Sequence, residues 1–237
     1  LITFQQDNAW GYVTLWAVVL TVIALHEHAH GLTCVHFGGE VREMGMLFLF
    51  FQPCLYCNVS DAWTFADRGK RLWVTAAGGY FEFWVGSVCT YIWWLSAEGT
   101  FVNTVAYQAM TVCGLSSVMF NFNPLIKLDG YYILCDLLEV NNLKQSSMAY
   151  LKANVKHYVF GEPIQEYDYS PKEKRAYLIY AMCSLVYITG LLFGIFVLVA
   201  GLAVPAFGLV GFILAGFIGY KLFFRYIKGA VTYVLRA

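Results

Sequence analysis

Charged residues are scarce in this 237-residue chain. Asp, Glu, Lys and Arg make up 13% of it, against 59% hydrophobic residues, and its mean hydropathy is +0.60. Soluble domains typically hold about 25% charged and roughly 45–50% apolar residues. The shortage of charge excludes a disordered chain, a coiled coil and collagen, and it argues strongly against an ordinary soluble globule.

Two long stretches have no charged side chain at all, namely the 45 residues 176–220 and the 28 residues 99–126. A helix needs about 20 apolar residues to cross a bilayer, where its backbone polar groups must be satisfied internally. The first stretch is too long for one crossing, so we expect two spans, roughly 176–200 and 203–226. Gly201 and Pro205 would supply the turn between them.

Three further spans are expected upstream. The first begins near Trp10 and ends at Gly38-Gly39, and the second covers about 72–97. The third covers 99–122. It should break near Asn123-Pro124 and resume over 129–140, because Pro lacks a backbone donor and disfavours a helix at the preceding residue.

Residues 40–66 differ from the spans around them. They are rich in aromatics, contain Pro53 and have too short an apolar run to cross a bilayer. Such runs favour strands. We therefore expect a strand pair or hairpin lying against the membrane surface.

The predicted fold is an all-α polytopic membrane protein of about five transmembrane helices, with a short membrane-associated β segment between the first two. The whole chain, 1–237, is expected to form a single membrane domain. Its expected parts are a core of three helices in 10–140, a cytosolic segment in 141–175 and a C-terminal helical hairpin in 176–228.

Charge is unevenly distributed, although the formal net charge is zero and gives no reason to expect a nucleic-acid partner. If the spans alternate, 14 of the 15 Lys and Arg residues fall on one side, in 38–71, in 141–175 and after Tyr220. The other side carries only Asp7 and Glu98. Basic residues stay cytoplasmic during insertion, so the loops and the C-terminus are expected in the cytosol.

The first span carries the pattern HExxH at residues 26–30. His26 and His30 lie one turn apart on one helical face, so both imidazoles can bind one cation. Catalytic zinc usually has three protein ligands and an open position, and Glu27 could take a proton from the attacking water. The alternative is a group of interfacial histidines, but ionisable groups in a span usually mark a function.

A third ligand is expected at the break in the third span. Non-helical backbone at membrane depth is tolerated where it is buried in protein or lines a wet cavity. Asp129 follows Pro124 and precedes Gly130 there, and it could complete a zinc site. The alternative is that Asp129 only caps the helix that resumes.

These motifs resemble the site-2 protease family of intramembrane zinc metalloproteases. HExxH is followed about 90 residues later by NxxPxxxxDG, which begins at Asn121 and ends at Gly130. The resemblance implies that His26, His30 and Asp129 bind Zn²⁺ and that Glu27 activates water. It covers about 10–140. The stretches GGEVREMG and NPLIKLDGYYILCDLLE are most similar to bacterial peptide zinc metalloproteases, which are often linked to peptide export or maturation.

Two positions depart from the family pattern. The family segment AGPxxN is AGGYFE here, at residues 77–82. Since the family Asn orients substrate, the resemblance implies that Glu82 does so, or that it lines the cavity or pairs with Lys127. Lys127 replaces a second family Pro and could stabilise an oxyanion or pair with Glu82. Asn121 is a further expected substrate-binding residue.

The sequence also contains CxxC at Cys54 and Cys57. Zinc sites of that type need a second cysteine pair, and none lies at a suitable spacing. A reduced pair is therefore expected.

The predicted function is hydrolysis of a peptide bond in a membrane-associated or exported peptide. The expected partners are a peptide or membrane-protein substrate, the lipid bilayer of a bacterial plasma membrane, and export or maturation proteins. Residues 40–60 could pair with an extended substrate by strand addition. The alternatives are an export or assembly subunit with a structural zinc site, and an inactive protease homologue that binds membrane peptides.

Overall fold

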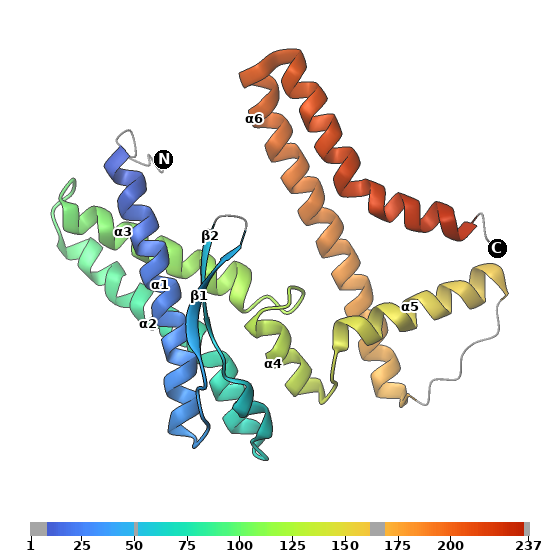
Figure 1. Ribbon diagram of the computed structural model, residues 1–237, viewed down its shortest axis with the longest axis horizontal. Coiled ribbons are helices and arrows are strands. Elements are labelled where there is room, and N and C mark those ends of the chain that lie inside the picture. Colours follow the sequence, from blue (N-terminus) through green and yellow to red (C-terminus); the bar gives the residue numbers. More distant parts are fainter. Residues whose placement is uncertain (1–8, 50–51, 162–168, 235–237) are drawn as a thin grey trace. The chain divides into compact units, whose positions relative to one another are not determined.

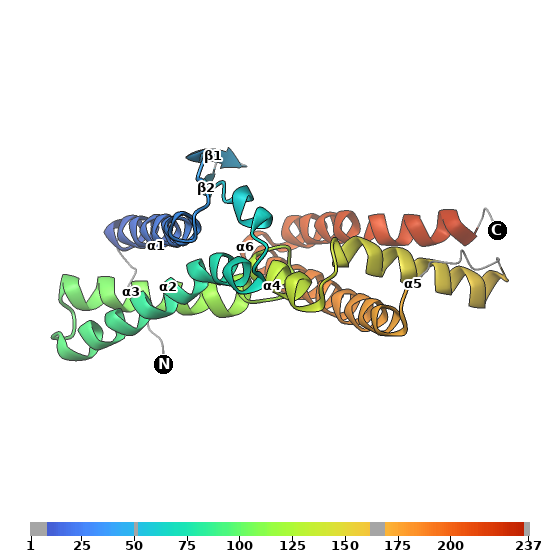
Figure 2. The same cartoon turned by 90° about the horizontal axis from the view of Figure 1, so that it is seen from below.

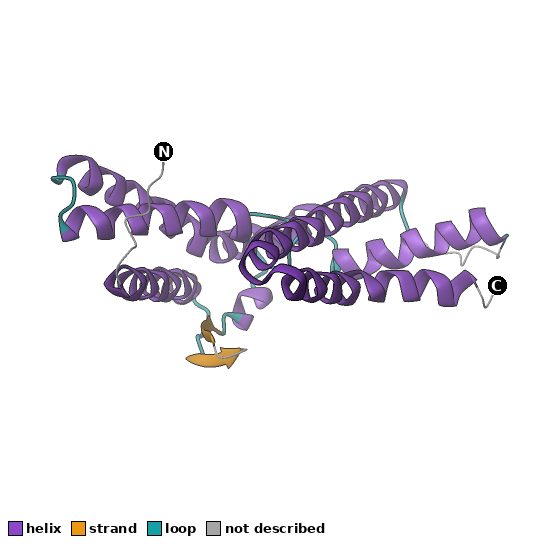
Figure 3. Cartoon of the chain, turned by 90° about the horizontal axis from the view of Figure 1, so that it is seen from above, coloured by secondary structure: helices purple, strands orange, loops and turns teal. Residues whose placement is uncertain are grey.

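The computed structural model describes residues 9–49, 52–161 and 169–234. It is mainly helical with one two-stranded sheet, which confirms the predicted helical fold with a short β segment (Figures 1 and 3). Contacts divide the chain into two compact units, Leu1–Asn141 and Asn142–Ala237, and each is described by itself. The α-helices are α1 (Ala9–His36), α2 (Arg68–Leu95), α3 (Phe101–Leu115), α4 (Asp129–Leu138), α5 (Leu143–Phe160) and α6 (Pro171–Val234).

Helix α1 ends where the sequence predicts. Gly38 has φ +90°, a conformation that favours glycine. Its N–H donates to the carbonyl of Val35 at 3.0 Å, and that of Gly39 donates to the carbonyl of Cys34 at 3.0 Å. This pair of bonds is a Schellman motif, which satisfies the last carbonyls of the helix and turns the chain away.

The predicted strand pair follows α1. Strands β1 (Met44–Leu49) and β2 (Gln52–Cys57) are antiparallel, with Met44 opposite Cys57 and Leu49 opposite Gln52. The hairpin projects from the helices of its unit, and β2 packs on α1 (Figure 2). A 3-10 turn, η1 (Ser60–Thr64), then leads back to the helices.

Helices α2 and α3 form an antiparallel hairpin against α1 (Figures 1 and 2). Asp67 caps α2 by accepting a hydrogen bond from the N–H of Gly69 at 2.8 Å. The apolar contact between the three helices has a buried cluster at its centre, made of Val18, Val22, Ala109 and Cys113. This packing fixes α1, and the HExxH residues on it, against α2.

The predicted break in the third span is confirmed. The α-helical part of α3 stops at Leu115, and a π-turn, η2 (Ser116–Asn121), continues it. The chain then passes Pro124 without regular structure and re-enters a helix at Asp129. Gly130 is needed there, since a Cβ would lie 2.5 Å from the carbonyl carbon of Phe122.

In the second unit, the expected turn at Gly201 and Pro205 is wrong. Both residues continue α6, and the chain reverses at Gly208, which has φ +55° and ψ −127° (Figure 1). Proline has a helical φ, so the helix can continue through Pro205 although it loses a backbone hydrogen bond there, whereas Gly208 adopts a positive φ that glycine permits. The two arms meet again at Gly219, where a Cβ would lie 2.7 Å from the ring of Phe196.

Two helices of the described residues are long and apolar enough to cross a membrane. They are Trp10–His36 in α1 and Pro171–Lys221 in α6, and the second contains the reversal at Gly208. Helix α5 lies within the predicted cytosolic segment 141–175.

Candidate metal centre

Three potential ligand atoms converge between α1 and the first residue of α4. Nε2 of His26 and Nε2 of His30 are 3.0 Å apart. Oδ2 of Asp129 lies 3.1 Å from the first and 3.3 Å from the second. Both histidines are buried, and Asp129 is half-buried. Residues far apart in the sequence thus form one group that could hold a metal ion.

The spacing and chemistry of this group fit a metal ion. Ligand atoms about 2.0–2.1 Å from a tetrahedral zinc are about 3.3 Å from one another, close to the three distances found here. Oδ2 of Asp129 is buried and accepts no hydrogen bond, although both imidazole nitrogens are within ion-pair distance. A metal ion between these three atoms would give each of them a partner. Lone pairs that face one another in this way are stabilised by a shared cation.

The backbone of α2 fixes the tautomer of His30. Nδ1 of His30 lies 2.7 Å from the carbonyl oxygen of Val74, which can only accept a hydrogen bond. Nδ1 must therefore carry the proton, and Nε2 presents its lone pair to the group. Metal-binding histidines are commonly held in this way by a carbonyl or carboxylate behind the ring.

Gly78 allows α2 to approach both imidazoles. A Cβ at this position would lie 2.5 Å from Nε2 of His26 and 2.5 Å from Nε2 of His30. The next residue, Gly79, lies against the ring of Phe122, 2.5 Å from where its Cβ would be. The sequence alone does not show why glycine stands at both positions, because the need for it arises from packing between helices.

Glu27 faces a cavity beside the ligand group. The cavity has a volume of about 310 Å³ and is bounded by α1, β2, η1, α2 and α4. His30, Asp129 and Glu27 all line it. Glu27 is half-buried, and a backbone hydrogen bond from Cys57 reaches its carboxylate. A small molecule or peptide in this cavity would contact two candidate ligands and the candidate base together.

The far wall of the cavity is polar and aromatic. Arg71 donates from Nε to Oδ1 of Asp136 at 3.3 Å and from Nη1 to the carbonyl of Phe65 at 2.8 Å. The rings of Trp63 and Tyr132 meet edge to face, with centroids 5.8 Å apart. These contacts join η1 to α4 and α2 to α4, so they also hold Asp129 in place.

Of the three expected substrate-binding residues, Glu82 and Asn121 lie together and Lys127 lies apart. Glu82 is 2% exposed, and its Oε1 lies 3.1 Å from Nδ1 of His26. Asn121 donates to Glu82 at 3.3 Å. Lys127 is exposed, with its ammonium 5.7 Å from the ring centroid of Tyr131, and makes no ion pair with Glu82. The Glu82–Lys127 pair considered from the sequence is therefore wrong.

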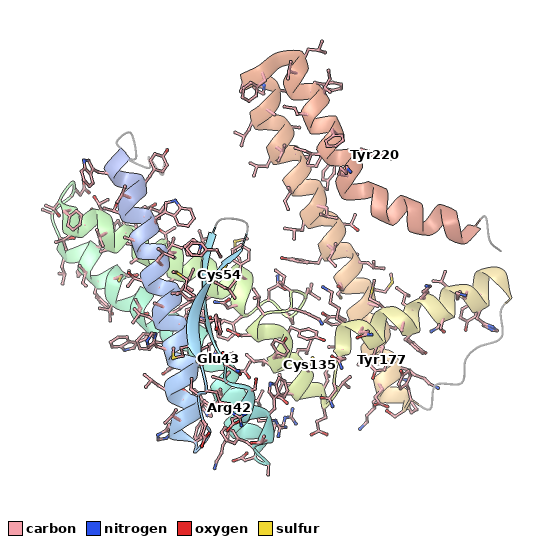
Figure 4. The ribbon with its side chains drawn as sticks, viewed as in Figure 1. Arg42, Glu43, Cys54, Cys135, Tyr177 and Tyr220 are labelled. Atoms are coloured by element: carbon pink, nitrogen blue, oxygen red, sulfur yellow. The ribbon has the colours of Figure 1, made fainter. Side chains whose placement is uncertain are left out.

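The remaining candidate ligands lie elsewhere. His28 is exposed, and its Nδ1 is 2.6 Å from the carbonyl of Ala24, so it does not join the group. Cys54 (labelled in Figure 4) and Cys57 both belong to β2, and side chains three positions apart point to opposite faces of a strand. Burial, followed by the charge of Glu27, raises the pKa of the Cys57 thiol to about 11, so the thiol stays protonated.

Comparisons with known proteins identify no relative. No family model matches the chain, and neither a curated protein nor a solved structure matches it.

Proposed function

We propose that this chain is an intramembrane zinc metalloprotease of the site-2 protease type. One observation carries the proposal: His26, His30 and Asp129 converge within 3.0–3.3 Å beside a cavity that Glu27 also lines. The cavity leaves room for a peptide. Structural zinc sites are usually closed by four protein ligands, whereas catalytic sites have three and an open position, and three donors converge here.

The residues of the site have distinct tasks in this reaction. His26, His30 and Asp129 would hold Zn²⁺, which supplies a Lewis acid that polarises the scissile carbonyl and acidifies water. Glu27 takes the proton of the attacking water and returns it to the leaving amine. Half-burial suits this task, because the carboxylate is shielded from bulk water yet faces the cavity.

The fold supports a membrane location with several crossings. Helices α1 and α6 are long and apolar enough to cross a bilayer, and the reversal at Gly208 divides α6 into two arms. Helices α2 and α3 pack beside α1, and many of their large apolar side chains are exposed, including Trp84, Trp94 and Phe101. The one-sided distribution of Lys and Arg favours a cytosolic location for the loops and the C-terminus, in a bacterial plasma membrane.

The β hairpin is suited to presenting an extended substrate. Peptide amides are hidden in a helix, so a substrate segment must unwind before hydrolysis. The sheet of the described residues has only two strands, so each strand has an edge without a ladder partner. A substrate strand added there would gain backbone hydrogen bonds near Glu27, since β2 ends at Cys57 beside that carboxylate.

The decisive experiment compares the protein with its Glu27→Gln variant. Both are purified in detergent, loaded with one equivalent of Zn²⁺ and incubated with a peptide library whose products are read by mass spectrometry. We expect cleavage by the wild type, at least 100-fold less by the variant, and equal zinc content in both, because Glu27 is not a ligand.

Other outcomes point to the alternatives. Equal zinc in both proteins with no cleavage by either would favour an export or assembly subunit with a structural metal. Peptide binding without product would indicate an inactive homologue. The matched control is Glu98→Gln, which changes an exposed carboxylate, and this variant should cleave peptides like the wild type.

A further inference from the structure

A second carboxylate lies behind the metal centre, on the side of His26 away from the cavity. Glu82 is 2% exposed and sits in the middle of α2. Its Oε1 is 3.1 Å from Nδ1 of His26, while Nε2 of the same ring faces Asp129. The imidazole thus lies between two carboxylates, one on each nitrogen. A buried charge in such a helix is costly and needs a compensating role.

Hydrogen-bond donors surround Glu82 and leave it no room to bind substrate. Oε1 accepts from the hydroxyl of Ser116 at 3.1 Å, and Oε2 accepts from the hydroxyl of Ser117. The amide of Asn121 lies 3.4 Å from Oε1 and 3.3 Å from Oε2. Together with the contact between Oε1 and His26, these bonds give both carboxylate oxygens at least two polar contacts each. The carboxylate is therefore held in one orientation.

The π-turn after α3 makes this arrangement possible. A π-helix has its backbone bonds five residues apart and so brings positions i and i+5 to the same side. Here the amide of Asn121 donates to the hydroxyl of Ser116, five positions earlier, at 3.3 Å. A regular α-helix would rotate Asn121 away from Ser116. The π-turn thus directs three side chains of one segment at Glu82.

The contact with Glu82 decides which nitrogen of His26 can bind a metal. A carboxylate can only accept a hydrogen bond, so the contact with Glu82 calls for a proton on Nδ1. Nε2, which Asp129 approaches at 3.1 Å, is then the nitrogen that a metal ion would bind. The amide of Asn121 also lies near Nδ1, at 3.4 Å. If that donor governed the ring, the proton would move to Nε2 and block metal binding. The carboxylate of Glu82 is closer to Nδ1 than the amide of Asn121 is, and it is charged, so Glu82 determines the tautomer of His26.

We propose that Glu82 is a positioning residue that holds His26 for metal binding, and that Ser116, Ser117 and Asn121 hold Glu82. This role replaces the substrate-binding role expected from the family motif. It rests on the metal centre of the proposed function, but not on proteolysis. Carboxylates behind metal-bound imidazoles fix the ring and raise its basicity, and removing them typically weakens metal binding about 10- to 100-fold.

The test measures metal affinity rather than activity. Zn²⁺ affinity of the full chain in detergent is determined by competition with a chromophoric chelator for the wild type and for Glu82→Gln. Gln has the same shape without the charge, and its amide can donate to Nδ1, which favours the wrong tautomer. We expect Glu82→Gln to bind Zn²⁺ about 10- to 100-fold more weakly. Glu82→Asp, which restores the charge, should recover part of the loss.

A control separates positioning from general loosening of the fold. Gln108 on α3 is 4% exposed and donates to the carbonyl of Gly11 at 3.3 Å, remote from the centre. Gln108→Leu removes a buried polar group from the same helices and should leave Zn²⁺ affinity unchanged. Visible spectra at saturating Co²⁺ add a second readout, because the bands report the ligand field, and they should shift in Glu82→Gln only.

The outcomes are distinct. Wild-type affinity and an unchanged Co²⁺ spectrum in folded Glu82→Gln would overturn the positioning role. If that variant does not fold, Glu82→Asp and Ser117→Ala decide instead, and unchanged affinity in both would overturn it. If the wild type binds Zn²⁺ and shows the predicted loss in Glu82→Gln but cleaves no peptide, the proposed protease function fails and the role of Glu82 stands.

Discussion

Gly78 of α2 lies directly against the imidazole of His26, so close that a Cβ would be 2.5 Å from Nε2. The helix backbone itself thus forms one wall of the candidate metal centre. Any larger residue must either push the imidazole aside or move α2 away from α1. The position therefore links helix packing to metal binding.

The first prediction follows from this contact. Gly78→Ala should reduce Zn²⁺ affinity at least 10-fold, because the added methyl displaces both imidazoles from their converging positions. Isothermal titration with Zn²⁺ in detergent measures the effect. Gly114→Ala is the control, since a Cβ there would meet nothing within 4 Å. Equal loss of affinity in the two variants would show that the contact at Gly78 is not the cause.

The second prediction concerns metal stoichiometry. The wild type should hold about one zinc per chain by mass spectrometry, and Asp129→Ala should lose most of it, because two ligands remain where three converge. Glu139→Ala removes an exposed carboxylate that pairs with Arg68 and should retain the metal. A zinc-free wild type after supplementation would show that the convergence does not form a zinc site.

The third prediction tests the hairpin. Met46→Pro places a residue without an N–H in the middle of β1, opposite Leu55, and should abolish cleavage while zinc content stays at the wild-type level. Met46 is largely exposed, so Met46→Val is a suitable control that retains the strand. Normal cleavage by Met46→Pro would rule out strand addition at this hairpin.

The fourth prediction concerns the C-terminal hairpin. Gly208 has a backbone conformation closed to other residues, so Gly208→Val should destabilise α6 by about 1–3 kcal/mol. Thermal unfolding of the detergent-solubilised protein, monitored by size-exclusion chromatography, would detect this loss of stability. Gly216→Ala, at a helical position with open space around it, should be neutral or stabilising. Since none of the three candidate ligands lies on α6, zinc content should be unchanged in both.

Features governed by local sequence could be predicted. Gly38 ends α1 and Pro124 interrupts the third span because each acts on its own stretch of backbone. The convergence of His26, His30 and Asp129 could also be anticipated, since HExxH spacing follows from helix geometry and Asp129 stands beside a break. The strands between the first two helices could also be predicted, because a short aromatic run in the local sequence determines them.

Features that depend on contacts between segments could not be predicted from the sequence. The requirement for Gly78 appears only when α2 lies on α1, and the role of Val74 depends on its carbonyl rather than its side chain. The π-turn has no clear sequence pattern. Its role becomes apparent only in the structure, where it brings Ser116 and Asn121 together beside Glu82. The reversal at Gly208 was misassigned because several glycines compete in that stretch, and local sequence does not rank them.

The position of Asp129 at the start of α4 has a consequence for how the chain is held together. Two donors come from one helix and the third from a residue 99 positions beyond His30, so a bound ion would close a loop of that length. Cross-links over about 100 residues remove much conformational entropy from the unfolded chain. The ion would then act as a cross-link within the N-terminal unit, and the free energy of metal binding would be part of the free energy of folding.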